Sequence, residues 1–170
     1  EIVVDNYMVV NTHPADLSVV REDGFRPFAG ADGVGNTLRD KSPVICSSAH
    51  LATSQVDGGP VLFTSPDIPI DYNGFADFAE MRKFYLRAVN EHSRLLTAKS
   101  LYDIAMGFFA VDGKGALRHK GQPVPLGVKI AAFEANVPLY ERDTMKLLRP
   151  DNIAVIGASA KGGIGWTVLN

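Results

Sequence analysis

The stretch "SSAHLATSQVDGGPVL", residues 47–62, says most about the fold of this 170-residue chain. Residues 46–53 alternate loosely in polarity, which predicts a strand, and "QVDGGP" follows as a turn. Asp57 precedes Gly58 and Gly59, and an Asp-Gly-Gly sequence suits an ordinary turn that needs positive φ angles. A carboxylate after a strand can equally belong to a site. "VLFTS" then predicts a further strand or the start of a connection.

A second polar stretch, "NTHPADL", occupies residues 11–17. It follows the apolar, β-branched residues 2–10, which predict a buried strand or two short pieces leading into a loop at Asn11. Asn11 and His13 stand two positions apart at the predicted strand end, where they could hold a reacting carbonyl group. An ordinary turn with polar residues is the alternative.

Together, the two stretches resemble the folate-dependent formyltransferases, a family that includes glycinamide ribonucleotide formyltransferase, methionyl-tRNA formyltransferase and formyltetrahydrofolate deformylase. In that family an Asn-x-His-Pro loop ends one strand. A later Thr-x-His strand precedes an Asp-x-Gly-Pro turn, whose Asp lies seven residues beyond the His, as it does here. The resemblance covers roughly residues 1–130, and the matching residues are Asn11, His13 and Pro14, then His50, Asp57 and Gly59-Pro60.

The sequence departs from the family pattern in several places. Ala15-Asp16-Leu17 stands where the family has Ser and a leucine pair, Ser48 replaces the Thr, and the segment from His13 to His50 is longer. The family's N-terminal strands and helices, which supply a glycine-rich loop for the acceptor and part of the folate pocket, are not in this sequence. The resemblance is therefore to the C-terminal half of a formyltransferase-like catalytic domain.

The resemblance implies an enzyme that moves a formyl group from 10-formyltetrahydrofolate to an amine acceptor. Such a transfer passes through a tetrahedral intermediate with negative charge on the formyl oxygen, which positioned donors stabilise. By resemblance, Asn11 and His13 supply these donors. Asp57 lies against His13, raises its pKa and helps to move protons. Three supporting residues are implied: Gly58 and Gly59, which let the backbone approach the pterin, and His50, which could also be a packed core or turn histidine.

Other readings remain open. The same three residues would serve a formyltetrahydrofolate deformylase, in which water is the acceptor. A non-catalytic formyltransferase-like scaffold or sensor, fused to a CoA-ligase module, is the alternative from another class. A metal site is disfavoured, because Cys46 and His50 would lie about 13 Å apart along a strand. Cys46 as a nucleophile is disfavoured too, since the sequence shows no base positioned for it.

The rest of the chain predicts an α/β fold with a partial, parallel-leaning formyltransferase-type sheet, flanking helices and a C-terminal β-hairpin. Proline and glycine in residues 14–45 predict a long loop with a short helix near Gly35–Lys41. Further elements are a helix from Phe75 to Val89 with Asn73 as N-cap, a second helix from Arg94 to Met106 that stops at Gly107, and a hairpin in residues 108–130.

The C-terminal residues predict a separate unit. We expect a formyltransferase-like domain in residues 1–133, a linker in 134–151, and the start of a CoA- or nucleotide-binding-like domain in 152–170. The last segment resembles the opening of the CoA-binding domain of NDP-forming acyl-CoA synthetases. Its possible anion-binding loop contains Gly157, Gly162, Gly163 and Gly165.

The composition limits the kinds of partner and the cellular compartment that we expect for this protein. A formal charge of −2 gives no basic surface for a phosphate backbone, so nucleic acid is disfavoured. One cysteine excludes an intrachain disulfide and fits a reducing compartment. Without a signal peptide or an apolar run of about 18 residues, we expect a cytoplasmic protein off the membrane. The chain opens with Glu1, so we expect a piece of a longer polypeptide whose open sheet edge pairs with another chain or a missing N-terminal half.

Overall fold

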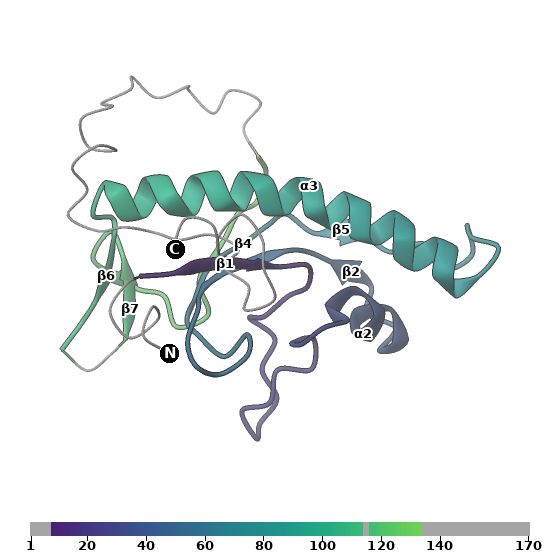
Figure 1. Ribbon diagram of the computed structural model, residues 1–170, viewed down its shortest axis with the longest axis horizontal. Helices are drawn as coiled ribbons and strands as arrows, with labels where there is room; N and C mark the ends of the chain where they lie inside the picture. The colour runs from purple at the N-terminus through teal and green to yellow at the C-terminus, as the bar shows by residue number, and fades with distance from the viewer. Residues whose placement is uncertain (1–7, 114–115, 134–170) are drawn as a thin grey trace, which may run out of the picture.

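The computed structural model describes residues 8–113 and 116–133. One long helix, α3, runs across one face of a small sheet, with α2 beside its N-terminal half and a hairpin at its C-terminal end (Figure 1). The elements are β1 (Val10–His13), α2 (Gly33–Arg39), β2 (Val44–Ile45), β3 (Ser48–Leu51), β4 (Val61–Thr64), β5 (Ile68–Pro69), α3 (Phe78–Ala105), β6 (Phe109–Val111), β7 (Leu117–His119), β8 (Gln122–Pro123) and β9 (Val128–Lys129).

The main sheet has the strand order β1-β3-β4-β9. β1 pairs with β3, and β3 with β4, in antiparallel fashion, whereas β4 and β9 are parallel. The predicted α/β class is confirmed, but the parallel-leaning sheet is wrong. The turn between β3 and β4 is too short for the crossover of a dozen or more residues that parallel pairing needs, whereas the path from β4 to β9 runs through α3. The path from β1 to β3 is also long and contains α2, yet these two strands pair in antiparallel fashion.

The first strand differs from its prediction at its end. Asn11 and His13 were expected in a loop, but both lie within β1. The register with β3 runs from the Val10–Leu51 pair to the His13–Ser48 pair, so backbone pairing keeps these polar residues in the strand. The predicted strand residues 2–7 lie outside the described part of the chain.

The face of the sheet under α3 carries the main core. Val10 and Ala49 are fully buried there, together with Phe63. Leu96 and Ile104 of α3 belong to the same cluster. Because side chains alternate along a strand, Asn11, His13 and His50 project from the opposite face.

A single helix, α3, replaces the two helices that the sequence predicted. Its N-cap is Asp77 rather than Asn73: the Asp77 carboxylate accepts a hydrogen bond from the Glu80 N–H at 2.8 Å. The C-terminal end is close to its prediction, since the helix ends at Ala105 and Gly107 follows with φ +70°. No Gly or Pro interrupts the 28 residues of α3, so the backbone has no reason to break where the apolar pattern shifts.

The short helix α2 is confirmed, beginning two residues before its predicted start. Asp32 caps it by accepting from the Gly35 N–H at 3.2 Å. The same carboxylate pairs with Arg39 at 3.0 Å and with Arg82 of α3 at 2.7 Å, so Asp32 joins the two helices. Beneath them lies a second core cluster of Val34, Leu38, Ile45, Met81, Tyr85 and Val89.

The predicted hairpin is confirmed as β6 and β7, and β8 extends it to a three-stranded sheet. Asp103 of α3 is completely buried against it and pairs with His119 of β7 at 2.7 Å and with Lys99. The predicted linker 134–151 and the C-terminal segment 152–170 lie outside the described residues, as does its glycine loop of Gly157, Gly162, Gly163 and Gly165. None of the helices in the described part is long and apolar enough to cross a membrane.

Candidate active site

His13 ends β1 with its ring held on both sides. Its Nδ1 lies 3.2 Å from Oδ2 of Asp57, and its Nε2 lies 2.7 Å from the backbone carbonyl oxygen of Phe28. Both neighbours accept hydrogen bonds, so only the protonated ring can donate to both at once. Burial lowers the pKa of His13, although the Asp57 carboxylate and the Phe28 carbonyl raise it. Asp57 thus raises the pKa of His13, as expected, but the effect of burial is larger and the net pKa is lowered.

Asp57 sits in the turn between β3 and β4 with φ +50°, a left-handed conformation that is uncommon outside glycine. The turn is tight, because a Cβ at Gly59 would lie 1.7 Å from the Leu51 carbonyl oxygen. The Gly30 N–H donates to Oδ2 of Asp57 at 2.8 Å. Burial on its own would raise the pKa of Asp57, but the contacts with His50, Gly30 and His13 lower it to about 2. Asp57 is therefore a carboxylate at neutral pH.

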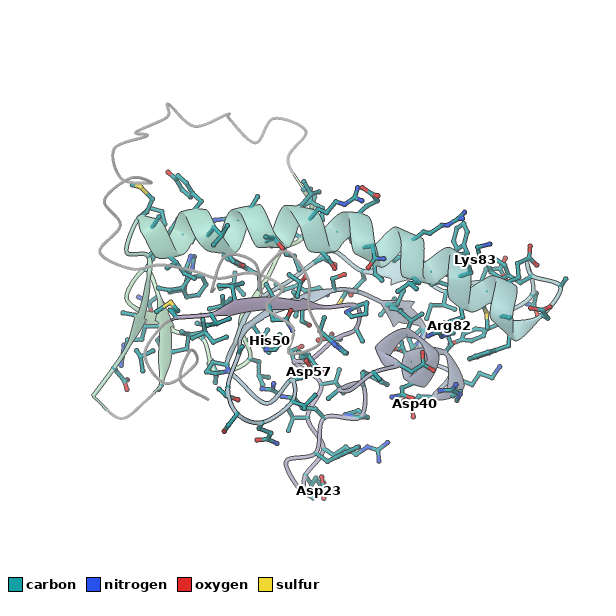
Figure 2. The ribbon with its side chains drawn as sticks, in the orientation of Figure 1. Asp23, Asp40, His50, Asp57, Arg82 and Lys83 are labelled. Carbon is teal, nitrogen blue, oxygen red and sulfur yellow. The ribbon has the colours of Figure 1, made fainter. Side chains whose placement is uncertain are left out.

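His50 lies in β3 on the other side of Asp57. Its Nε2 is 3.4 Å from Oδ1 of Asp57 but is not aligned for a hydrogen bond, and its Nδ1 lies 3.0 Å from the Leu51 carbonyl oxygen. Figure 2 shows His50 and Asp57 together on the side of the sheet away from α3. One carboxylate thus contacts two buried histidines, one on each of its oxygens.

Asn11 occupies the strand position directly opposite His50. It is two residues from His13, so both lie on the same face of β1. Its side chain is half-buried, and among the described residues the amide has no hydrogen-bond partner. Within the described part of the chain, the Asn11 amide is thus an uncommitted donor, and Nε2 of His50 also makes no hydrogen bond.

The segment around Arg26, which was predicted as a loop, completes the site. Arg26 donates from Nη1 to the carbonyl oxygens of Asp57 at 2.7 Å and Gly59 at 2.9 Å. Two residues on, the Phe28 carbonyl meets His13, and two further on, the Gly30 N–H meets Asp57. Alternate residues of one stretch therefore hold both the histidine and the carboxylate, although no motif in the sequence marks them.

Ser48 and Gly33 also support the position of His13. The Ser48 hydroxyl donates to the Ala15 carbonyl and accepts from the Leu17 N–H, both at 2.8 Å, which fixes the chain just after His13. Gly33 leaves room for the imidazole, because a Cβ there would lie 2.4 Å from His13 Nε2. Ser48, which stands at the Thr position of the family pattern, thus still supplies a hydroxyl group that bonds to this loop.

The described residues support neither a metal site nor Cys46 as a nucleophile. Across residues 8–113 and 116–133, no group of three or more His, Cys, Asp or Glu side chains is arranged to hold a metal ion. The thiol of Cys46 is buried, and burial together with Asp16 raises its pKa to about 12, which suppresses the thiolate a nucleophile needs.

No protein-family model matches the chain, and no curated protein matches it. Among solved structures, phosphoribosylglycinamide formyltransferase from Coxiella burnetii, in complex with CHES, aligns with a TM-score of 0.59 and 17% identity over 75% of this chain and 54% of that one. The enzyme of the same name from Anaplasma phagocytophilum aligns with a TM-score of 0.52 and 13% identity over 71% and 51%.

Glycinamide ribonucleotide transformylase 1 from Symbiobacterium toebii gives a TM-score of 0.50 and 17% identity over 65% of this chain and 44% of that one. The similarity shows that the chain has a formyltransferase-type α/β fold. The chain spans about half the length of these solved structures.

Proposed function

We propose that the chain carries the catalytic half of an enzyme that transfers a formyl group from 10-formyltetrahydrofolate to an amine. The observation that carries this proposal is the contact of His13 with Asp57 at 3.2 Å, on the sheet face that also bears Asn11. The formyltransferase-type fold supports it at the level of the reaction class.

In the proposed reaction the acceptor amine attacks the formyl carbon, and the formyl oxygen becomes an oxyanion. The side-chain N–H of Asn11 donates to that oxygen, and the protonated ring of His13 adds positive charge beside it. Preorganised donors of this kind typically contribute about 10²–10³ in rate each. The intermediate then collapses with N10 of the folate as the leaving group, and the proton of the attacking amine passes to N10.

We propose a defined role for Asp57, which contacts His13. A carboxylate with a pKa of about 2 is a poor proton acceptor at neutral pH. Its proposed role is therefore to orient the imidazole and stabilise its charged form, rather than to receive the proton. The Nε2–H of His13 donates to Phe28 in the free chain, so the formyl oxygen has to compete with that carbonyl.

The co-substrate and the remainder of the enzyme follow from the same proposal. In this proposal the pterin of the folate lies near the turn at Gly58 and Gly59, where Gly58 faces the Gln55 side chain and Gly59 is buried against Leu51. β1 is one of the two edge strands of the described sheet, and we propose that this edge pairs with another chain or with an N-terminal half that recognises the acceptor. The CoA-ligase-like tail stays a prediction.

The test uses the longest polypeptide that carries this chain, with 10-formyltetrahydrofolate and a panel of primary amines. Release of tetrahydrofolate is followed with and without amine, and a folate analogue is titrated by calorimetry. We expect Asn11→Ala and His13→Ala each to lose at least about 10² in kcat/KM while folate binding persists. Thr12→Val is the matched control, because Thr12 stands between these residues and projects from the other face of β1.

The outcomes separate the readings. Tetrahydrofolate release that needs amine supports transfer, whereas release at the same rate without amine indicates a deformylase. Folate binding without turnover, or no binding at all, contradicts the catalytic proposal and favours a scaffold. An unchanged rate in His13→Ala contradicts it as well.

A further inference from the structure

We infer that Arg26 is a positioning residue of this site, which holds the Asp57 turn in its working conformation and sets the proton affinity of His13 through its charge. The inference rests on the proposed function only for its kinetic consequence. Arg26 lies outside both matching motifs, in the long segment between His13 and His50.

The guanidinium is placed on backbone rather than on a carboxylate. Nη1 donates to the Asp57 carbonyl at 2.7 Å and to the Gly59 carbonyl at 2.9 Å. Arg26 is half-buried, and no carboxylate of the described residues forms an ion pair with it. Its positive charge therefore lies beside the turn, where the Asp57 carboxylate is the negative group that acts on it, although the two do not form a direct ion pair.

The turn has a reason to need this clamp. Asp57 holds φ +50°, which costs a residue other than glycine on the order of 1 kcal/mol, and the chain must fold tightly enough to bring Gly59 against Leu51. Two carbonyls fixed by one guanidinium restrict the rotation of the Asp57–Gly58 and Gly59–Pro60 peptide planes. The direction of the Asp57 side chain follows from that backbone, so the clamp fixes both contacts of its carboxylate.

The charge also acts on the titrating groups of the site. The titratable groups that face the turn are His13 from β1, His50 from β3 and Asp57 itself. A fixed positive charge disfavours protonation of each of them. Removal of the charge should therefore make His13 easier to protonate. A lysine at the same place should preserve this effect, while its more flexible ammonium replaces the oriented Nη1 group that donates to both carbonyls.

The experiment is a titration of the His13 ring by NMR in the whole chain, without folate. The ring signal is assigned from its absence in His13→Gln, and Arg26→Met and Arg26→Lys are compared with the parent chain. We expect Arg26→Met to move the His13 midpoint upward by about half a pH unit or more, and Arg26→Lys to leave it within about 0.2. In the kinetic assay, Arg26→Met should lose about tenfold or more in kcat, with Arg26→Lys restoring part of it.

Each alternative has its own result. An unchanged His13 midpoint in a folded Arg26→Met chain overturns the inference, because a purely structural residue would lower stability without moving the titration. A shift in Arg26→Lys as large as in Arg26→Met overturns it too, since the charge would then not be the cause. Should Arg26→Met fail to fold, Arg26→Gln provides the neutral variant. Absence of formyl transfer in the parent chain contradicts the proposed function alone and leaves the titration decisive for Arg26.

Discussion

Gly33 begins α2, and the side chain it lacks would occupy the space of His13. The imidazole cannot move aside easily, since Asp57 and the Phe28 carbonyl hold its two nitrogens. The requirement for glycine at position 33 thus comes from the space that His13 of β1 occupies, and not from helix propensity.

This arrangement predicts the effect of Gly33→Ala. Alanine normally favours a helix over glycine by about 1 kcal/mol, but here its Cβ meets Nε2 of His13. We expect a net loss of about 1–3 kcal/mol in the free energy of unfolding, measured in urea, and a displaced His13 titration. Asn36→Ala in the same helix is the control and should stay within about 0.5 kcal/mol. A Gly33→Ala chain that is more stable, with His13 unchanged, would contradict the fit described here.

The low pKa of Asp57 predicts acid sensitivity. The folded-state pKa of about 2 lies below the unfolded value, so the carboxylate contributes stability above about pH 4 and loses it as the pH falls towards 2. The contribution is on the order of 2 kcal/mol. Urea unfolding at a series of pH values between about 5 and 2 measures it, and Asp57→Asn should show a shallower decline. Equal slopes in both chains would show that Asp57 is not perturbed.

Part of the site could be predicted from the family resemblance. The Asn-x-His-Pro stretch and the seven-residue spacing of His50 and Asp57, which carry that resemblance, indicated residues that do lie together. Arg26, Phe28 and Gly30 could not be found in this way, because two of them act through backbone groups that every residue has. Their partners depend on the path of an irregular segment, which neither periodicity nor propensity encodes.

At the scale of elements, α3 shows why its sequence suggested two helices. Its first half packs against α2 and β2, where Met81, Tyr85 and Val89 belong to one cluster. Its second half packs against the sheet through Leu96 and Ile104, which belong to another. The apolar stripe therefore changes direction part-way along a continuous backbone, and the change in pattern resembles an end.

The contact of α3 with the hairpin gives a prediction at this scale. Asp103 is fully buried and contacts Lys99 and His119, so Asp103→Asn leaves the Lys99 ammonium and the His119 ring without their carboxylate partner. We expect a loss of about 3–5 kcal/mol in the free energy of unfolding in urea. Glu91→Gln, which breaks an exposed pair with Arg94 on the same helix, should cost less than about 1 kcal/mol. Similar losses in both variants would mean that the buried pair does not tie the hairpin down.

At the scale of the whole molecule, one helix connects the two core clusters and should make them unfold together. Leu96→Ala in one cluster and Leu38→Ala in the other should each lower the free energy of unfolding by about 2–5 kcal/mol. Both should shift a single urea transition with an unchanged slope. Circular dichroism and NMR signals from each cluster provide the measurement, and two separated transitions would show that the clusters are independent.

The direction of the strands was the part of the overall fold least accessible from sequence. A strand such as β4 has four buried residues, which is the pattern of a strand covered on both faces, and such strands suggest parallel sheets. In this molecule α3 covers one face and loops gather over the other, so antiparallel strands acquire the same composition. The pattern of buried residues therefore depends on whether both faces of a strand are covered, and not on whether its neighbours run parallel or antiparallel to it.

Arg26, Phe28 and Gly30 hold the site from one stretch of chain, so the geometry of the site should not depend on the length of the loop that precedes them. These anchors stand after Phe25, while Ser48 fixes the other end at Ala15 and Leu17. Between them, Gly24 faces open space, and doubling the length of a flexible loop costs only about 0.6 kcal/mol. A peptide tag or a fluorescent reporter inserted at Gly24 should therefore be carried without disturbing the histidines, which makes this loop a natural attachment point for labelling the protein.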